Sequence, residues 1–302
     1  MQKEKYLIVI GGPTAIGKSQ LAIDLAKEFN CEILSADSRQ FYREMSIGTA
    51  KPSEEEMQGI KHHFINNISI NDTYNVGKYE EEALQTLHRI YEKNNLAILV
   101  GGSGLFINAI LYGLDDLPPS DEKIRNDLEI QLIEKGLESL QQQLQKLDPE
   151  YYQSADMQNP RRVVRALEVC LVTGKPYSQL RVKKIVYREF KTILVVLNTD
   201  REILYNRINQ RVDIMMQQGL LEEVKNLTPH KNNNALQTVG YKELFDYLNN
   251  QCTLDFAVDK IKQNSRNYAK RQITWFKKNE EAKWFEPSQK NEIVNYLKDS
   301  LA

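Results

Sequence analysis

The chain has little cysteine and no long apolar run. Its 302 residues include three cysteines, Cys31, Cys170 and Cys252, which lie far apart and without CxxC spacing. This excludes a disulfide-stapled secreted domain and a zinc site of paired cysteines, and it favours reduced thiols. The apolar run near the N-terminus is far too short for a signal peptide or a membrane span. We therefore expect a cytoplasmic protein that does not associate with membranes.

The chain also has almost no net charge. Its 40 Lys and Arg residues balance 41 Asp and Glu residues, which gives a formal charge of −1 at pH 7. No global field therefore draws the protein to nucleic acid, and any such binding must come from local patches. The mean hydropathy of −0.54 is low but does not indicate disorder. The length allows one large domain or two modest ones.

The segment that organises the chain is YLIVIGGPTAIGKS, residues 6–19. Tyr6–Ile10 predicts a short buried strand, and a helical pattern of apolar residues follows the segment. Between them the pattern G-x-x-x-x-G-K-[ST] predicts a phosphate-binding loop. Its residues are Gly12, Pro13, Thr14, Ala15, Ile16, Gly17, Lys18 and Ser19. Backbone N–H groups would hold a phosphate pair, Lys18 would add a charge, and Ser19 could offer a hydroxyl to bound Mg²⁺. The loop indicates a polyphosphate without identifying it.

Two further predicted strands end in polar or glycine-rich turns. Glu32–Ala36 precedes Asp37, and Leu96–Val100 runs into the glycine turn of residues 101–104. Parallel strands place such turns at the carboxyl edge of a sheet, where open α/β folds bind ligands. Position alone leaves Asp37 open between a catalytic role, a Mg²⁺ ligand and a helix cap. The glycine turn either approaches a ligand or is a tight strand-to-helix connection. Ser46–Pro52 predicts another loop at this edge.

The middle of the chain differs in character after residues 117–120, LPPS. Helical spacing of leucines predicts two helices that are broken near Gly136, and Asn159-Pro160 predicts the start of another that ends at Gly174. The apolar run Thr192–Leu197 then predicts a return to the sheet. We predict an α/β fold: a P-loop-type parallel sheet flanked by helices, from residues 1–116 and 187–302. Residues 117–186 would form an all-helical insertion domain.

Two segments concentrate positive charge. Residues 159–192 contain nine Lys or Arg residues against two Glu, and the predicted helix Lys260–Lys278 has seven basic residues and no acidic one. On that helix Lys262, Arg266 and Lys270 form a stripe with a spacing of four residues. Because like charges on one helix repel, contact with polyphosphate or RNA is favoured over a solvated face.

Histidine and arginine pairs complete the candidate residues. Adjacent His62 and His63 would point in different directions, so a loop or strand pair is favoured over a metal site. Asp200 predicts the start of a helix that carries Arg207 and Arg211 four residues apart. Paired arginines near a phosphate loop can clamp a diphosphate, and ordinary surface charge is the alternative.

Seven sequence blocks occur in order along nearly the whole chain. They are GPTAIGKS from residue 12, ADSRQFYREMSIGTAKPS from 36, VGGSGLF from 100, QNPRRVVRALEV from 158, RVDIMMQQGLLEEV from 211, VGYKEL from 239 and YAKRQITWF from 268. Together they resemble the bacterial tRNA dimethylallyltransferase family, also called tRNA isopentenyltransferase. The resemblance implies transfer of a dimethylallyl group from dimethylallyl diphosphate to N6 of the adenosine that follows the anticodon in tRNA, with Mg²⁺ as cofactor.

The resemblance also implies roles for single residues. The loop Gly12–Ser19 would hold the diphosphate, Lys18 and Arg211 would stabilise it as it leaves, and Arg207 is a second candidate. Asp37 would be the general base, or at least a hydrogen-bond acceptor, at N6. The residues implied to contact tRNA are Asp37, Ser38, Arg39, Gln40, Ser103, Arg125, Arg161, Arg162, Val163, Val164, Arg165, Gly240, Tyr241 and Lys242.

Two other functions share some of these features. A nucleotide kinase would use the same loop, sheet and arginines, but it would not need the basic helix or the basic insertion. A nucleotide-switched RNA-binding protein would explain the basic surfaces and would leave Asp37 and the second glycine turn unexplained. We expect the protein to be a monomer.

Overall fold

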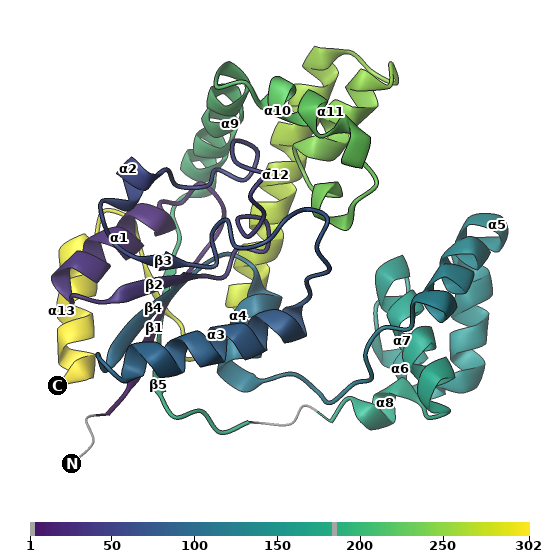
Figure 1. Ribbon diagram of the computed structural model, residues 1–302, viewed down its shortest axis with the longest axis horizontal. Helices are drawn as coiled ribbons and strands as arrows, with labels where there is room; N and C mark the ends of the chain where they lie inside the picture. The colour runs from purple at the N-terminus through teal and green to yellow at the C-terminus, as the bar shows by residue number, and fades with distance from the viewer. Residues whose placement is uncertain (1–3, 183–185) are drawn as a thin grey trace. The chain divides into compact units, whose positions relative to one another are not determined.

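The computed structural model describes residues 4–182 and 186–302. They form two compact units (Figure 1): residues up to Leu111 with Tyr187–Ala302, and Tyr112–Val186. The second unit begins at Tyr112, a few residues before the predicted boundary at 117. Residues 183–185 of the predicted insertion, with two of its lysines, lie outside the described residues.

The first unit is built on a parallel sheet, as the sequence predicts. Its strands are β1 (Tyr6–Gly11), β2 (Glu32–Ser35), β3 (His62–His63), β4 (Leu96–Val100), β5 (Lys191–Leu197) and β6 (Lys283–Phe285). Their order is β3-β2-β4-β1-β5-β6, and every neighbouring pair is parallel. In the register of the centre, Ile8 of β1 lies opposite Ile98 of β4 and Ile193 of β5. The segments that follow β1, β2 and β4 therefore meet at one edge.

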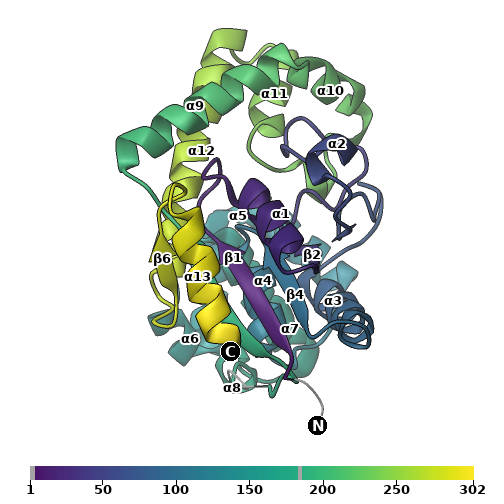
Figure 2. The same cartoon turned by 90° about the vertical axis from the view of Figure 1, so that its left-hand side faces the viewer.

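Helices cover both faces of the sheet, which explains why the central strands are apolar on both sides. α1 (Lys18–Glu28) and α13 (Lys290–Leu301) pack on one face, and Figure 2 shows them along β1. α3 (Val76–Tyr91) and α4 (Gly104–Tyr112) pack on the other. α9 (Arg201–Gln217) and α12 (Leu254–Phe276) contribute to both apolar cores. The remaining elements are α2 (Glu54–Met57), α10 (Leu220–Asn226), α11 (Tyr241–Leu248) and the 3₁₀ turns Thr228–His230 and Asn234–Leu236.

Element bounds agree with the sequence predictions where periodicity is strong and differ at the C-terminal end. The predicted helix Lys260–Lys278 corresponds to α12, which begins at Leu254. Its start is set by the Thr253 hydroxyl, whose oxygen accepts a hydrogen bond from the Phe256 backbone N–H at 3.3 Å. β6 and α13 follow and were not predicted. A three-residue edge strand such as β6 is too short to show a periodic pattern.

The second unit is helical. Its helices are α5 (Glu122–Leu147), α6 (Pro149–Ser154), α7 (Pro160–Thr173) and α8 (Tyr177–Leu180). The predicted break at Gly136 is confirmed, because this glycine interrupts α5 with φ 75° and ψ 173°. The predicted caps of α7 are confirmed as well: the Asn159 side chain accepts from the Arg162 backbone N–H, and Gly174 ends the helix at φ 68°. Glycine adopts this left-handed conformation without the strain that a Cβ adds.

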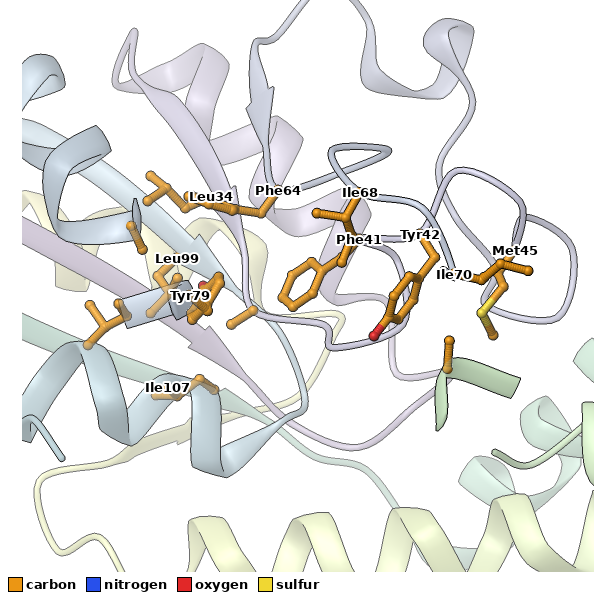
Figure 3. Packing of buried hydrophobic residues seen from close by; sticks show 14 of the residues in the cluster. Leu34, Phe41, Tyr42, Met45, Phe64, Ile68, Ile70, Tyr79, Leu99 and Ile107 are labelled. Carbon is orange, nitrogen blue, oxygen red and sulfur yellow. The ribbon is translucent and has the colours of Figure 1, made fainter. Parts of the chain in front are cut away.

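A cluster of aromatic rings supports the turn after β2 (Figure 3). Phe41 stacks on Tyr79 with ring centroids 5.2 Å apart, and Phe64 meets Tyr79 edge-on at 5.1 Å. The Tyr79 hydroxyl donates a hydrogen bond to the Ser35 carbonyl at 2.9 Å, so the buried phenol is satisfied. Because Phe41 directly follows residues 37–40, its burial fixes the position of that turn.

We expect Phe41→Ala to lower the free energy of unfolding of the first unit by about 3–5 kcal/mol, the usual cost of deleting a buried phenylalanine ring. Phe256→Ala is the matched control, because Phe256 is 60% exposed whereas Phe41 is 1% exposed. The control should change stability by about 0.5 kcal/mol or less. Urea titration followed by tryptophan fluorescence measures this unit, since both tryptophans lie in it. Equal losses for the two variants would contradict the structural role of Phe41.

Candidate active site

A cavity of about 270 Å³ lies at the carboxyl edge of the sheet. Its lining comes from the GPTAIGKS loop, the turns after β2 and β4, the loop of residues 46–52, and helices α9 and α12. Among the lining residues are Thr14, Lys18, Ser19, Asp37, Ser38, Arg39, Gln40, Gly48, Thr49, Gly101, Gly102, Arg211, Gly240, Tyr268 and Gln272. The structure therefore brings together residues that the sequence places in separate motifs.

The GPTAIGKS loop connects β1 to α1 in the strand–loop–helix order that the sequence predicts. A Cβ on Gly12 would lie 2.6 Å from the Leu197 carbonyl oxygen, so only glycine fits there. Gly17, at φ 103°, immediately precedes the first helical residue, Lys18. The helix N-terminus thus begins at the cavity, and its unpaired N–H groups favour a bound anion.

Lys18 and Arg211 line the cavity together with the carboxylate of Asp37. Lys18 Nζ donates to the Pro13 carbonyl at 2.7 Å, and Arg211 Nη1 donates to the Thr14 hydroxyl at 3.3 Å. Burial lowers the pKa of Lys18 to about 8; Arg211 adds to this and Asp37 opposes it. Burial also lowers the pKa of Arg211, again opposed by Asp37. With Arg39 also on the cavity wall, three basic residues against one carboxylate leave the cavity suited to an anion.

Asp37 is held in a tight turn. Its Oδ1 accepts a hydrogen bond from the Arg39 backbone N–H at 3.0 Å, and its own backbone N–H donates to Ser35 Oγ at 3.3 Å. No helix begins at this residue, so the carboxylate caps a turn and the helix-cap alternative is wrong. The next residue joins the second glycine turn, because the Ser38 backbone N–H donates to Ser103 Oγ at 3.4 Å.

Gln272 on α12 joins the two glycine-containing turns, and motif analysis did not find it. Its Oε1 accepts from the Thr14 backbone N–H at 2.9 Å, and its Nε2 donates to the Gly102 carbonyl at 3.0 Å. The side chain is buried, and both halves of its amide are used. Nothing in its spacing distinguishes it from other polar residues of α12, and the only sequence signal is its place in the YAKRQITWF block.

The second glycine turn is tight because α12 packs directly on it. A Cβ on Gly102 would lie 2.0 Å from Gln272 Nε2, and one on Gly104 would lie 2.2 Å from the Trp275 indole. Gly101 and Gly102 also line the cavity. The turn is therefore a tight connection, and it also brings backbone to the cavity; its approach to a ligand stays a prediction.

Glu223 holds the loop of residues 46–52 against the cavity and was likewise not predicted. Its carboxylate accepts from the backbone N–H groups of Ser46, Ile47 and Gly48 at 2.8–3.0 Å. The Tyr241 hydroxyl donates to the same carboxylate at 2.6 Å, and burial raises the pKa of Tyr241. This network places Gly48 and Thr49 on the cavity wall.

Comparisons with known proteins agree with this geometry. Residues 40–279 match the family model described as IPP transferase. The chain belongs to this family. A tRNA dimethylallyltransferase of Flavobacterium johnsoniae is 53% identical over 304 residues, which covers 98% of each chain. One of Christiangramia forsetii is 50% identical with the same coverage.

Solved structures of the IPP transferase family have the same fold. The full-length tRNA isopentenylpyrophosphate transferase from Bacillus halodurans is 38% identical with a TM-score of 0.72, covering 99% of this chain and 97% of that one. A eukaryotic dimethylallyltransferase acting on tRNA is 29% identical with a TM-score of 0.74, covering 90% of this chain and 70% of that one.

Several residues that the resemblance to the IPP transferase family suggested do not lie in the cavity. Arg207 is exposed on α9 and is not among the residues that line the cavity. Tyr241 is fully buried, so its side chain holds a loop and is not free to contact RNA. Val163 and Val164 are buried in the core of the second unit and cannot present side chains to RNA. Lys242 is exposed at the start of α11.

The basic stripe of α12 is partly neutralised within the first unit. Lys262 pairs with Asp213 of α9 at 2.6 Å, and Arg266 Nη1 donates to Asn209 of the same helix at 2.6 Å. At Lys262, repulsion along α12 therefore does not require an external anion, whereas the hydrogen bond to the neutral Asn209 amide leaves the charge of Arg266 uncompensated by that contact. Lys270, the third residue of the stripe, is exposed.

Among the described residues, no helix is long and apolar enough to cross a membrane. The same part of the chain has no group of three or more His, Cys, Asp or Glu residues that could hold a metal ion. The two adjacent histidines form strand β3, which agrees with the prediction of a loop or strand pair. His62 Nδ1 contacts the Ile60 carbonyl at 2.8 Å, and His63 Nε2 contacts Glu32 at 2.6 Å.

The lowered pKa of Lys18 makes anion binding depend on pH. In the protein without ligand, Lys18 loses its proton above about pH 8. A bound diphosphate would favour the charged form of Lys18. Binding at high pH therefore takes up a proton, and the affinity falls as the pH rises. If the ligand is dimethylallyl diphosphate, as the resemblance to the family implies, we expect its affinity to fall about tenfold between pH 7 and pH 9, because Lys18 with a pKa of about 8 is mostly protonated at the lower pH and mostly neutral at the higher. The terminal phosphate is already ionised over this range.

Lys18→Arg is the control, because arginine stays charged throughout. Whatever its absolute value, the affinity of this variant should not vary with pH. Isothermal titration calorimetry in buffers of different ionisation enthalpy measures both the affinity and the proton uptake. A native chain with no proton uptake at pH 8 would contradict the assignment.

Proposed function

We propose that this chain transfers a dimethylallyl group from dimethylallyl diphosphate to N6 of the adenosine that follows the anticodon in tRNA, releasing diphosphate. The observation that carries the proposal is the meeting of one carboxylate, Asp37, with two cations, Lys18 and Arg211, beside a helix N-terminus in one cavity. Membership of the IPP transferase family supports it. Its relatives are named for tRNA modification, which disfavours the kinase and switch alternatives.

The cations suit the leaving group. As the allylic carbon separates from oxygen, negative charge accumulates on the diphosphate, and positive groups fixed in advance stabilise that charge most. Lys18 and Arg211 rest on loop atoms of Pro13 and Thr14. Both side chains therefore lie at the place where a phosphate on the loop would bind. Because the Thr14 hydroxyl is a weak partner for a guanidinium, an anion would replace it readily.

Asp37 suits the nucleophile. The exocyclic amine of adenine is weakly nucleophilic because its lone pair is delocalised into the ring, so removal of its proton during attack assists the reaction. One oxygen of Asp37 is fixed by the Arg39 backbone N–H. That bond orients the carboxylate through Oδ1, and Oδ2 would accept the proton. The turn is braced by Gln40, whose Nε2 donates to the Thr49 and Ala50 carbonyls.

Mg²⁺ is proposed as the cofactor. Ser19 and Asp37 supply a hydroxyl and a carboxylate to the same cavity, and Mg²⁺ prefers oxygen ligands shared with a phosphate. When bound, the ion would neutralise part of the diphosphate charge. Ser19, at the second position of α1, would hold it through its hydroxyl, and Asp37 is an alternative ligand.

The tRNA is proposed to contact both the cavity rim and the arginines of the second unit. Ser38, Arg39, Gln40 and Gly240 line the cavity, and Ser103 hydrogen-bonds to Ser38 at its edge. Bases of an anticodon loop can be splayed out and read individually, at a cost of a few kcal/mol. In the second unit Arg161 and Arg162 are exposed in the first turn of α7, where the helix dipole adds to their attraction for phosphate.

Asp37→Asn tests the base. The amide keeps the shape of the side chain but cannot accept the proton, so single-turnover transfer at saturating substrates should fall by about 10²–10⁴. Affinities for tRNA and dimethylallyl diphosphate should change far less, because the proton transfer belongs to the transition state. Liquid chromatography and mass spectrometry of the tRNA nucleosides measures the product.

Repeating the Asp37→Asn measurement at low and high Mg²⁺ separates the two roles of Asp37. A general base predicts the same slow transfer at both concentrations. A Mg²⁺ ligand predicts weaker diphosphate binding that high Mg²⁺ partly restores. Transfer near the native rate would exclude both roles.

Arg161→Glu with Arg162→Glu tests the second unit. Phosphate contacts release counterions, so log affinity for tRNA should fall linearly with log salt, and losing two contacts should flatten the slope by about 1.4–1.8. Dimethylallyl diphosphate should bind as in the native chain. Lys135→Glu with Lys146→Glu is a control with the same change in charge on the same unit. An unchanged slope in the arginine variant would remove α7 from the RNA surface.

A further inference from the structure

The second unit contains a carboxylate that is completely buried and surrounded by arginines. Glu168 of α7 has no exposed surface. Its Oε2 accepts from Arg125 Nη2 of α5 at 2.7 Å and from Arg165 Nη1 at 3.0 Å. Its Oε1 accepts from the backbone N–H of Asp121 at 2.9 Å. One buried side chain therefore holds two guanidinium groups and the start of α5.

Stability alone is a poor explanation for such a cluster. A buried charge carries a large desolvation cost, and replacing a buried ion cluster by apolar side chains of similar volume is often neutral or stabilising. The arginines are not buried with the carboxylate: the side chains of Arg125 and Arg165 are 38% and 28% exposed. The buried part of the cluster is thus the negative charge, and the surface part is positive.

The contacts of Glu168 determine where the arginines of α5 and α7 lie. Arg161 and Arg165 are one helical turn apart on α7 and lie on the same side of it. Arg165 and Arg125 meet at a single oxygen of Glu168, although two like charges at that distance would otherwise repel. Arg165 Nη2 also donates to the Pro118 carbonyl at 2.7 Å, which fixes the guanidinium plane. Arg125 of α5 thus lies beside Arg165 of α7, and Arg161 precedes Arg165 by one turn of the same helix.

We propose that Glu168 is a positioning residue for tRNA binding: it holds Arg125 and Arg165 side by side so that, with Arg161, they form a preformed row of phosphate contacts. This inference rests on the proposed function. Guanidinium groups bind phosphate best in a fixed planar orientation. Holding them before the RNA arrives removes the ordering cost that free arginine side chains would add to binding.

Glu168→Gln tests the proposal, because the amide keeps the shape but carries no charge and turns a donor toward one partner. With Arg125 and Arg165 no longer held, we expect tRNA affinity to fall about tenfold at low salt and the slope of log affinity against log salt to flatten by about 1. Binding of dimethylallyl diphosphate and transfer at saturating tRNA should be unchanged. Glu129→Gln, an exposed residue of the same unit, makes the same change in charge and should have little effect.

A background without the two arginines separates positioning from a structural role. In the Arg125→Ala, Arg165→Ala double variant, adding Glu168→Gln should cause no further loss of tRNA affinity. A loss of the same size in both backgrounds would overturn the proposal, because Glu168 would then act through the fold. Native affinity and salt slope in the Glu168→Gln single variant would overturn it as well.

Glu168→Asp keeps the test decisive if the glutamine variant does not fold. It retains the buried countercharge, but its shorter side chain cannot reach both guanidinium groups. A folded Asp variant with weaker tRNA binding supports the proposal, and one with native binding overturns it. If the native chain itself neither binds tRNA nor modifies it, the proposed function fails, and this inference fails with it.

Discussion

The close approach of helix α12 to the carboxyl edge of the sheet is the constraint on which the site depends. Three glycines make it possible, since a Cβ on Gly11, Gly102 or Gly104 would lie 2.0–2.3 Å from an atom of Phe276, Gln272 or Trp275. At this distance a buried glutamine can reach two loops at once, and Gln272 does so through Thr14 and Gly102. A buried amide with both ends bonded fixes its partners, because an unpaired end would cost about 1–3 kcal/mol. The phosphate loop and the second glycine turn are therefore held as one piece.

Charge is distributed so that the neutral chain still has positive surfaces where anions would bind. Some basic residues are compensated inside the fold, as Lys262 is by Asp213. Others are gathered around a buried acid whose carboxylate is not exposed, as Arg125 and Arg165 are around Glu168. The net charge of the chain therefore does not identify the binding partner. The position of each countercharge shows which basic residues are available to bind an anion. A basic stripe read from one helix overstates the available charge, because the neighbouring helix can neutralise it.

The sequence predicts those features whose interacting residues are close together in the chain, and it does not predict those whose partners are far apart. The central strands β1, β2, β4 and β5, the glycine loop, the caps of α7 and the break at Gly136 depend on residues that are close together in the sequence, so short patterns predict them. Lys18 and Asp37 were found because each directly follows a predicted strand or its turn. Gln272 could not be found in this way, since its partner Thr14 is 258 residues away. The same holds for Glu223, which accepts from a loop some 175 residues earlier. Such residues look like ordinary polar surface until the helices are placed. For Val163 and Val164 the sequence predicted a contact that the structure does not allow. They lie within a block suggestive of RNA contact, but on helix α7 their side chains face the core.

The use of a phosphate-binding loop for prenyl transfer follows from what the loop stabilises. In a kinase the reacting atom is phosphorus, and the loop must hold the phosphates while the transferred group moves away from them. In the proposed reaction the bond that breaks lies between carbon and oxygen, and the whole diphosphate is the leaving group. The loop then stabilises the group that accumulates charge, and no catalytic group need approach phosphorus. What the site must add is an acceptor for the amine proton on the side of the carbon. Asp37 enters the cavity from a different strand than the loop does, with β4 between their two strands in the sheet. That separation lets one fold hold the leaving group and the base on different rigid elements, so that the allylic carbon can lie between them.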